Sequence, residues 1–556
     1  MKKIFSLFLL TGLLLTSCSD FLDLTPQGQE NSGNYMNTEE NAIKVINGIY
    51  DILSQTEGRG PDGDWMDHHY DFMLASIATD DAVKGSNLPD MPQLIDLEDY
   101  RLQQGSSLAT AFWIHGFWGV SRSNYAIKNL PDATIPENLK NRLLGESYFL
   151  RAYHYIYLLR HFGGVPLFSA PLNPSDFGKT VRATLHETFE FINADLRQAI
   201  ELLPERSTYP AADMGRATKG AARAFLAKSL MYQIGVDAEC EHTWNDVYNL
   251  TLAIINSGEY SLVPNFALLF EYENKNSSES IFEIQAADGT ASDAPASVGN
   301  AYPLFQGNRE SNTGANTGWG FHNPTQNLVD AFNPSDPRLS STVYGIGFNN
   351  EILYGVQMKF NRTEQGSNYL NRKAALPFKP SLDKAANKNI LIMRYADVLL
   401  IHAEAAYHTG KEVEARQYLN MVRERARNSS YCKGYVSGSP DGYTMPVTTP
   451  DVPNVNVSGT ALLDAILHER RLELAMESNR MWDLVRTGKL VDTVSKAKDT
   501  DLIGNEGRTD MEVRHEGIAN RIRNHAFTGK DNTVIPVLPI PLDEVQNWGL
   551  EQNPNY

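Results

Sequence analysis

The sequence has few cysteines and only one long apolar run. Cysteine accounts for 3 of the 556 residues, and the two that follow residue 18, Cys240 and Cys432, lie too far apart in the chain for a zinc knuckle. They could form a disulfide in an oxidising compartment, but we expect both to remain thiols. After the first segment, no stretch approaches the roughly 20 apolar residues of a membrane helix, so we expect a body that lies outside the bilayer.

Basic residues are also scarce. The chain has 67 Asp and Glu against 49 Lys and Arg, a net charge of −18, and no basic run offsets this excess. Such a body repels nucleic acid and anionic membrane surfaces, which makes both poor partners, whereas a neutral ligand fits better. Apolar residues at 42% and aromatic residues at 10% still provide material for a sizeable core.

The usual signatures of enzymes and metal sites are missing. No Gly-x-Ser-x-Gly turn, phosphate-binding loop or dinucleotide fingerprint occurs. His402 and His408 lie about 240° apart around a helix, whereas a zinc helix needs two histidines on one face. Asp62, Asp64 and Asp67 could offer oxygens to Ca²⁺, but the glycine and distal glutamate of a calcium loop are missing, so solvated turn carboxylates or sugar-binding groups fit better. We therefore expect no cofactor and no resident metal.

The first residues have the pattern of a lipoprotein signal. Lys2 and Lys3 precede an apolar segment that is too short to cross a bilayer comfortably, and small residues then lead to Cys18. We expect residues 1–17 to be removed and Cys18 to carry several acyl chains, which together give a stable membrane anchor. The alternative is an ordinary secretory signal with an incidental cysteine.

Apolar residues recur at helical spacing through most of the chain. The clearest unit is at residues 403–425, where small residues, a turn at Gly410 and a second helix are what a tetratricopeptide-type pair requires. No unit matches the full repeat signature, so the repeats are degenerate. The pattern also predicts helices over residues 140–162, 184–203 and 218–234, within a nearly continuous helical region at 108–236, and over residues 39–53 and 244–257 on either side of it. The expected fold class is mainly α.

Two regions interrupt the helical pattern. Glycine and proline break residues 58–101 into a long structured loop, and long loops often carry function. Residues 270–390 are rich in Gly, Asn, Ser, Pro and aromatic residues, which indicates an irregular subdomain inserted into the scaffold. Because no low-complexity linker occurs, one compact body is expected. Its expected segments are a signal peptide at 1–17, an anchor and extended arm at 18–38, a helical repeat scaffold at 39–269 with a binding loop at 58–101, the insertion at 270–390, C-terminal helical repeats at 391–490 and a closing tail at 491–556.

Several segments, in order along the whole chain, resemble the SusD/RagB family of nutrient-binding outer-membrane lipoproteins. The most specific is HERRLELAMESNRMWDLVRTG at residues 468–488. The tail LPIPLDEVQNWGLEQNPNY at 538–556 is similar to the usual ending of the family, with Asn555 where glycine is common. The remaining segments are residues 18–23, 118–127, 146–166, 393–406 and 418–426.

The resemblance implies a tetratricopeptide-like α-superhelix with a loop-rich ligand-binding subdomain. It also implies a surface-exposed protein, lipid-anchored in the outer membrane, that captures oligosaccharide or polysaccharide for a SusC-like TonB-dependent transporter and is not an enzyme. Some members bind peptides, so a peptide-binding lipoprotein is the alternative, since a fold does not decide its ligand. A third reading, a surface glycoside hydrolase, would need two carboxylates about 5–10 Å apart across a sugar.

The block at residues 468–488 contains alternating charges that could be mistaken for a catalytic pair. Five of its charged residues fall along one face of a predicted helix, where opposite charges at i,i+3 and i,i+4 form a ladder of ion pairs. They are Glu469, Glu473, Glu477, Arg480 and Asp483. We interpret the block as a structural ion network, because ordered networks imitate catalytic clusters. Its members are Glu469, Arg470, Glu473, Glu477, Arg480 and Asp483.

A sugar binder needs flat aromatic side chains exposed on loops, with polar groups beside them. Trp65 and Trp319 lie in the two irregular regions, and Trp65 is the stronger candidate because Trp319 fits a buttressing role equally well. The other tryptophans lie in predicted helices or in the tail and are expected to be buried: Trp113, Trp118, Trp244, Trp482 and Trp548. The candidate ligand-binding residues are Asp64, Trp65, Asp67, Tyr70, Tyr302, Arg309 and Trp319.

Overall fold

The structure is a computed structural model of the chain. It describes residues 35–54, 58–59, 65–66, 75–87, 89–173, 175, 178–287, 302–309, 317–345, 352–354, 356–360, 365–377, 387–432, 443–444, 450–497 and 511–556. The expected signal peptide at 1–17 and the expected lipidation site Cys18 lie outside these residues.

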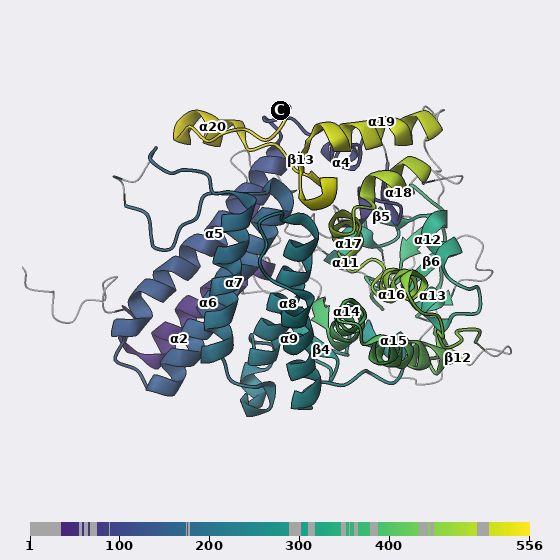
Figure 1. Cartoon of the computed structure of the whole chain (residues 1–556), viewed down its shortest axis with the longest axis horizontal. Coiled ribbons are helices and arrows are strands. Elements are labelled where there is room, and N and C mark those ends of the chain that lie inside the picture. Colours follow the sequence, from purple (N-terminus) through teal and green to yellow (C-terminus); the bar gives the residue numbers. More distant parts are fainter. Residues whose placement is uncertain are drawn as a thin grey trace, which may run out of the picture.

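The long helices of the first half of the chain lie side by side (Figure 1). From α5 onward each packs against the next one along the chain, and α2 packs across α5 and α6. They are α2 (Glu39–Ser54), α5 (Ser107–Asn129), α6 (Glu137–Phe162), α7 (Leu185–Leu202), α8 (Lys219–Val236) and α9 (Trp244–Ser257).

The ends of these helices follow from local chemistry. α6 ends at Gly163, whose φ of +74° favours glycine, and Pro166 follows shortly after. Thr184 caps α7 with a capping box, and the Thr218 hydroxyl caps α8. α9 ends at the left-handed Gly258. The predicted boundaries of these helices are therefore confirmed to within a few residues.

A second series of helices continues the first (Figure 1). α14 packs against α8 and α9, and only residues 409–411 join it to its antiparallel partner α15. Gly410 there has a φ of +77°, as expected for the turn of this pair. The series comprises α14 (Tyr395–His408), α15 (Glu412–Arg427), α16 (Thr460–Glu473), α17 (Arg480–Arg486), α18 (Leu490–Lys496) and α19 (Met511–Asn524). The expectation of a mainly α fold is confirmed.

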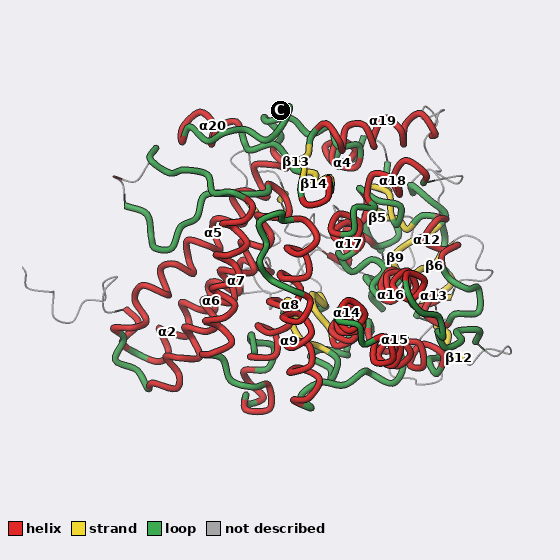
Figure 2. Tube along the Cα trace, in the orientation of Figure 1, coloured by secondary structure: helices red, strands yellow, loops and turns green. Residues whose placement is uncertain are grey.

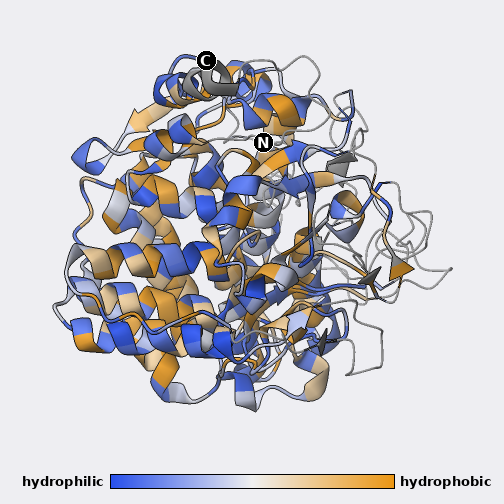
Figure 3. Cartoon of the chain, turned by 90° about the vertical axis from the view of Figure 1, so that its right-hand side faces the viewer, coloured by the Kyte–Doolittle hydropathy of each residue, from blue (hydrophilic) through white to orange (hydrophobic). Residues whose placement is uncertain are grey.

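No helix in the described part of the chain combines the length and the apolar character needed to cross a membrane. Polar and apolar residues alternate along the helices seen in Figure 3, where many of the polar residues lie on the outside. α6 is an exception, because both of its neighbours cover it and most of its residues from Leu143 onward are buried.

The insertion consists of short strands and helices between longer loops (Figure 2). Its strands form only two-stranded antiparallel pairs among the described residues, including β4 with β10 and β6 with β9. α10 (Phe266–Leu269) precedes the insertion and β10 (Ile390–Arg394) begins at its end. Between them lie β4 (Ser280–Ile284), α11 (Tyr302–Gln306), β5 (Phe321–Pro324), α12 (Gln326–Ala331), α13 (Pro337–Thr342), β6 (Val343–Gly345), β7 (Ile352–Leu353), β8 (Val356–Gln357) and β9 (Tyr369–Asn371). The pair of β11 (Tyr431–Cys432) and β12 (Tyr443–Thr444) lies further along the chain.

The expectation of one long loop at residues 58–101 is wrong for its second half. β3 (Ala82–Gly85) is fully buried and pairs with β5, and α4 (Gln93–Glu98) packs beside it. Local glycine and proline content could not reveal this, because the partner strand of β3 lies more than 200 residues away in the sequence. The first half contains the short pair β1 (Gly58–Arg59) and β2 (Trp65–Met66).

The core extends through both helical series and the insertion. Its buried apolar side chains run from Met36 to Leu550 in one continuous cluster, and two small clusters lie around Tyr344 and Phe266. One shared core supports the expectation of a compact body. Short 3₁₀ helices connect the elements at η2 (Tyr35–Asn37), η3 (Leu130–Asp132), η5 (Arg206–Thr208), η6 (Ala211–Asp213) and η10 (Lys530–Asn532).

The tail returns to the first helices. It contains β13 (Ala526–Thr528), β14 (Val534–Pro536) and α20 (Leu542–Trp548). The Asn553 amide donates to the carbonyl of Phe162, the last residue of α6, at 3.1 Å, and accepts from Arg182. Asn555 has a φ of +61°, a conformation that Asn tolerates better than most residues, which explains why it can stand where glycine is common.

Candidate ligand-binding surface

The charged block at residues 468–488 does not form a single helical ladder. α16 ends at Glu473 and α17 begins at Arg480, so the expected continuous stripe is interrupted. Each of the six predicted members forms an ion pair, but mostly with groups from other elements, and the i,i+3 pair of Asp483 with Arg486 is the exception. The expectation of a local ladder is wrong because the turn at residues 474–479 redirects the chain.

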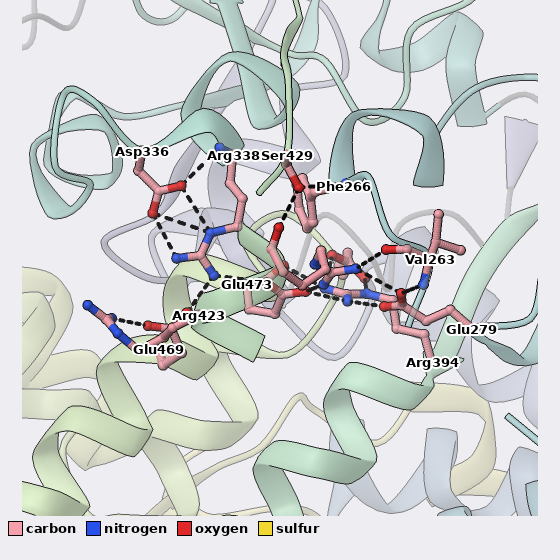
Figure 4. Close-up of polar contacts among 12 residues, drawn as sticks. Val263, Phe266, Glu279, Asp336, Arg338, Arg394, Arg423, Ser429, Glu469 and Glu473 are labelled. Carbon is pink, nitrogen blue, oxygen red and sulfur yellow. Dashed lines mark hydrogen bonds and ion pairs between the residues drawn. The ribbon is translucent and has the colours of Figure 1, made fainter. Parts of the chain in front are cut away.

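Glu473 lies at the centre of this network (Figure 4). It is fully buried and accepts hydrogen bonds from three guanidinium groups, those of Arg338 at 2.9 Å, Arg394 at 2.6 Å and Arg425. Arg394 and Arg425 both also contact Glu279 at 2.8 Å. The network therefore joins α16 to β10, α13, α15 and the residue just before β4.

Two further groups of ion pairs extend the network. Arg470 contacts Asp397 at 2.8 Å and Asp483 at 3.0 Å, which connects α16 to α14 and α17. Arg480 contacts Asp80 at 2.8 Å, which connects α17 to the segment before β3. These contacts fix the position of β3 relative to the helical scaffold.

The electrostatics of the network do not suit acid–base catalysis. Burial opposes ionisation of Glu473, but Arg425, Arg394 and Arg338 hold its pKa well below its ordinary value. The pKa of Asp397 is likewise lowered, because Lys228 and Arg470 outweigh its burial. A general acid needs a raised pKa and access to the leaving group, whereas both oxygens of Glu473 already accept hydrogen bonds.

The second half of the binding loop and the insertion together form a partly exposed polar patch. Val83 lies opposite Asn323 in the β3–β5 ladder, and the Ser86 N–H donates to the Gly320 carbonyl at 2.7 Å. The Trp319 N–H donates to the Leu304 carbonyl at 2.8 Å. These backbone bonds bring residues 86–90, 302–309 and 317–320 together.

Glycine allows these segments to approach closely. A Cβ atom at Gly318 would lie 2.2 Å from the Leu304 carbonyl oxygen, and one at Gly85 would lie 2.5 Å from the Gly320 carbonyl oxygen. Gly85 also has a φ of +76°. A side chain at either position would therefore push the segments apart.

Side chains from these segments form what we call the β3–β5 surface, defined by Ser86, Asp90, Arg309 and Trp319. Arg309 donates to the Ser86 hydroxyl at 2.7 Å and pairs with Asp90, and Ser86 donates to Asp90 at 2.9 Å. The side chains of Arg309 and Asp90 are each 32% exposed. Trp319 is half-buried, with its ring edge-on to Phe305 at 4.7 Å between centroids.

This arrangement offers what a neutral sugar requires. The indole can contact an apolar sugar face, and the guanidinium, carboxylate and hydroxyl can exchange hydrogen bonds with sugar hydroxyls. Burial opposes ionisation of Asp90, but Arg309 and Ser86 lower its pKa, so the carboxylate is charged and accepts hydrogen bonds at neutral pH. Within the described part of the chain, no cluster of three His, Cys, Asp or Glu side chains could hold a metal ion.

The other predicted ligand contacts are distributed differently. Tyr302 is only 6% exposed and packs in the main core, where burial raises its pKa to about 12, so it does not face solvent as a binding residue would. Trp65 begins β2, and only its backbone is described. Asp64, Asp67 and Tyr70 lie outside the described residues.

The remaining tryptophans mostly follow expectation. Trp113 and Trp482 are at most 4% exposed, and Trp548 packs partly against the core near Phe168. Trp118 is a correction, because its side chain is 40% exposed on α5. Trp244 is partly buried and stacks on His408, 4.2 Å between ring centroids.

Other groups singled out in the sequence have structural partners. His402 is fully buried and contacts the Thr251 hydroxyl at 2.8 Å and Glu414 at 3.2 Å. Cys240 and Cys432 do not form a disulfide. The Cys240 thiol contacts the His242 carbonyl, and Cys432 lies 3.1 Å from the Arg372 guanidinium.

The residues that sequence reasoning missed are Ser86 and Asp90. Both lie in the predicted binding loop, in the stretch Gly85-Ser86-Asn87-Leu88-Pro89-Asp90, whose turn-forming composition was a usable signal. Their pairing with Arg309 could not be foreseen, because it depends on the contact between β3 and β5.

Two family models match almost the whole chain. Residues 278–556 match the model described as the SusD family, and residues 20–231 match the model described as starch-binding associating with outer membrane. The chain belongs to the SusD family. The match of the second model places the association with the outer membrane at the level of the family.

Known members of the SusD family align over nearly their full length. SusD-like protein P38 of Formosa agariphila is 26% identical over 516 residues, which cover 88% of this chain and 92% of P38. The structure of a laminarin binding SusD-like protein has a TM-score of 0.69 at 25% identity and covers 94% of this chain and 100% of that chain. Surface glycan-binding protein A from Bacteroides thetaiotaomicron, in complex with laminarihexaose, has a TM-score of 0.68 at 21% identity, with 93% and 99% covered. These structures confirm the tetratricopeptide-like fold.

Proposed function

We propose that this chain captures a glycan at the β3–β5 surface. The observation that carries the proposal is the half-buried indole of Trp319 beside the partly exposed Arg309–Asp90 pair, since a sugar needs a flat apolar platform next to hydrogen-bonding groups. Membership of the SusD family supports it, as does a relative of similar fold whose name states that it binds laminarin. We also propose Trp65 as a second platform, from its place in the predicted binding loop.

We also propose that the chain acts as a lipid-anchored capture protein at the cell surface, without catalysis, and delivers its glycan to a SusC-like TonB-dependent transporter. The lipoprotein pattern ending at Cys18 supports the anchor, and the family description of association with the outer membrane agrees with it. The net charge of −18 supports a neutral ligand over a nucleic acid.

The first experiment is affinity electrophoresis of the chain from residue 19 onward through gels that contain a panel of polysaccharides, with laminarin included. Retardation by one glycan would support the proposal and identify the ligand class. Free migration through every gel would contradict glycan capture by the isolated protein and favour a peptide ligand.

Substitutions then locate the site. Trp319→Ala should weaken glycan binding by about 1–3 kcal/mol, taking the stacking of bases on aromatic rings as a guide. The double variant Trp65→Ala/Trp319→Ala should lose several kcal/mol of binding free energy. Arg309→Gln should weaken binding as well, because it removes charge-assisted hydrogen bonds. The matched control is Trp118→Ala, an exposed tryptophan on α5 outside the β3–β5 surface. Equal binding by Trp319→Ala and Trp118→Ala would remove Trp319 from the site.

An assay for new reducing ends tests the hydrolase reading. The purified protein should release none from any polysaccharide that it retards. Release that disappears in a carboxylate variant would overturn the assignment of a binding protein.

A further inference from the structure

A cavity lies between the helical scaffold and the turn that joins α16 to α17. It has a volume of about 60 Å³, and its lining comes from α6, α7, α8, β10 and residues 477–479. Aromatic and aliphatic side chains form most of its wall: Tyr153, Ile156, Tyr157, Phe189, Phe225 and Tyr232. None of these residues belongs to the β3–β5 surface, so an activity here is independent of glycan capture.

Positive charge at this cavity is only partly balanced. Arg160 lines it and lies over the Trp482 ring, 5.1 Å from the ring centroid. Within the described part of the chain, Arg160 forms no hydrogen bond and no ion pair. Lys228 also lines the cavity and donates to Asp397 at 2.8 Å and Asn479 at 2.6 Å, which uses two of the hydrogens on its ammonium group.

The nearby carboxylates do not neutralise Arg160. Asp397 is shared between Lys228 and Arg470, at 2.8 Å from each. Glu477 lines the cavity but is held by Lys373 at 2.6 Å and Arg394 at 2.7 Å. Because both carboxylates are already matched by two cations each, an anion in the cavity would meet a surplus of positive charge.

The turn at the mouth of the cavity is strained. Met476 and Ser478 have φ values of +64° and +61°, which non-glycine residues rarely adopt. The Ser478 hydroxyl is buried and has no hydrogen-bond partner, which leaves a buried donor unused. Backbone strain of this kind concentrates where a protein holds a ligand, and an unused donor beside two cations favours an anionic one.

We propose that this cavity binds a short-chain monocarboxylate. One water needs about 10–15 Å³ of such a cavity. The volume of about 60 Å³ therefore admits roughly four to six non-hydrogen atoms, the size of acetate to butyrate. The carboxylate accepts hydrogen bonds from Arg160, from the remaining hydrogen of Lys228 and from the Ser478 hydroxyl. Its short apolar chain lies among the aromatic side chains, where burial from water is favourable.

Saturation-transfer NMR on the protein with butyrate tests the proposal. Irradiation of the protein should produce saturation of the butyrate methyl and methylene protons. Arg160→Gln should reduce the affinity for butyrate by about 10-fold or more, because a hydrogen bond between two charged groups is stronger than one between neutral groups. Ile156→Phe, at the half-buried rim of the cavity, should reduce it as well by filling space.

Two controls separate the proposed site from general adsorption. Arg197→Gln removes a different exposed arginine, on α7 outside the cavity, and should leave the butyrate affinity unchanged. Butan-1-ol has the same apolar chain without the charge, so its saturation should not depend on Arg160. The absence of saturation with the unmodified protein, or equal butyrate affinities for the unmodified protein and Arg160→Gln, would overturn the proposal.

Discussion

The cluster of arginines and carboxylates around Glu473 and the one at the β3–β5 surface have sharply different surroundings. In the cluster around Glu473, the central carboxylate and Arg394 are at most 1% exposed, and three guanidinium groups contact the carboxylate. At the β3–β5 surface, Arg309 pairs with Asp90, and each of these side chains is 32% exposed. The first cluster is closed to water and the second is open to it.

The difference separates structural from exchangeable contacts. A buried ion pair that loses one partner leaves an uncompensated charge in a low-dielectric interior, so it cannot be opened without destabilising the fold. An exposed pair contributes at most about 1 kcal/mol, because solvent screens it and competes for its hydrogen bonds. A ligand can therefore take over the hydrogen bonds of Arg309 and Asp90 at little cost, whereas Glu473 is committed to the fold.

The strongest way to test this comparison is Glu473→Gln. The substitution keeps the shape of the side chain but leaves Arg338, Arg394 and Arg425 without their shared negative charge. We expect a loss of about 3–5 kcal/mol in the free energy of unfolding, measured by urea denaturation. Asp90→Asn is the matched substitution at the exposed pair and should cost less than about 1 kcal/mol. Similar losses for the two variants would refute the distinction between the clusters.

A second test concerns the backbone that holds the exposed cluster. Gly318→Ala places a methyl group 2.2 Å from the Leu304 carbonyl oxygen, so residues 317–320 must shift and Trp319 with them. We expect a destabilisation of about 1–3 kcal/mol by thermal or chemical unfolding, together with weaker glycan binding.

Gly105→Ala is the control for this substitution, because no atom lies within 4 Å of the added methyl group. It should leave both stability and glycan retention nearly unchanged. If Gly318→Ala behaved like Gly105→Ala in both measurements, the close approach would have no role in forming the site.

The smallest expected effect comes from a pair of intermediate exposure. The hydrogen bond to Asp237 raises the pKa of His186, whose side chain is 27% exposed, above its ordinary value. A histidine with a raised pKa stabilises the fold below its unfolded pKa of about 6.5, and this contribution is lost as the pH rises through the folded pKa. His186→Gln should therefore cost less than about 1 kcal/mol at pH 6, and the difference should shrink toward pH 8.

NMR titration of the His186 imidazole checks this prediction directly. Its midpoint should lie above that of an unperturbed histidine and should return toward it in Asp237→Asn. A midpoint at or below the ordinary value would show that the pair does not stabilise the charged imidazole.

The helices could be predicted from the sequence, but the long-range contacts between the elements could not. Thr184, Gly163 and Gly258 mark helix ends through interactions with their immediate neighbours, so a local pattern identifies them. β3 could not be recognised because its pairing with β5 is long-range. Trp118 was wrongly expected to be buried, because helical periodicity does not tell which face a neighbouring helix covers.

The same limit applies to the charged residues. The composition of residues 468–488 indicated an ion network, and those residues do form ion pairs. The three arginines that contact Glu473 come from positions 338, 394 and 425, outside that block. Likewise, Arg309 was a candidate from its position alone, whereas its partners Ser86 and Asp90 required the folded chain.

The contact between Asn553 and Phe162 has a consequence for the order in which the protein forms. The carbonyl at the end of α6 receives this amide donor from a residue 391 positions further along the chain. Translation delivers Asn553 long after α6, so α6 emerges from the ribosome before this partner exists. A truncation that removes Asn553 would thus first affect a helix made hundreds of residues before it.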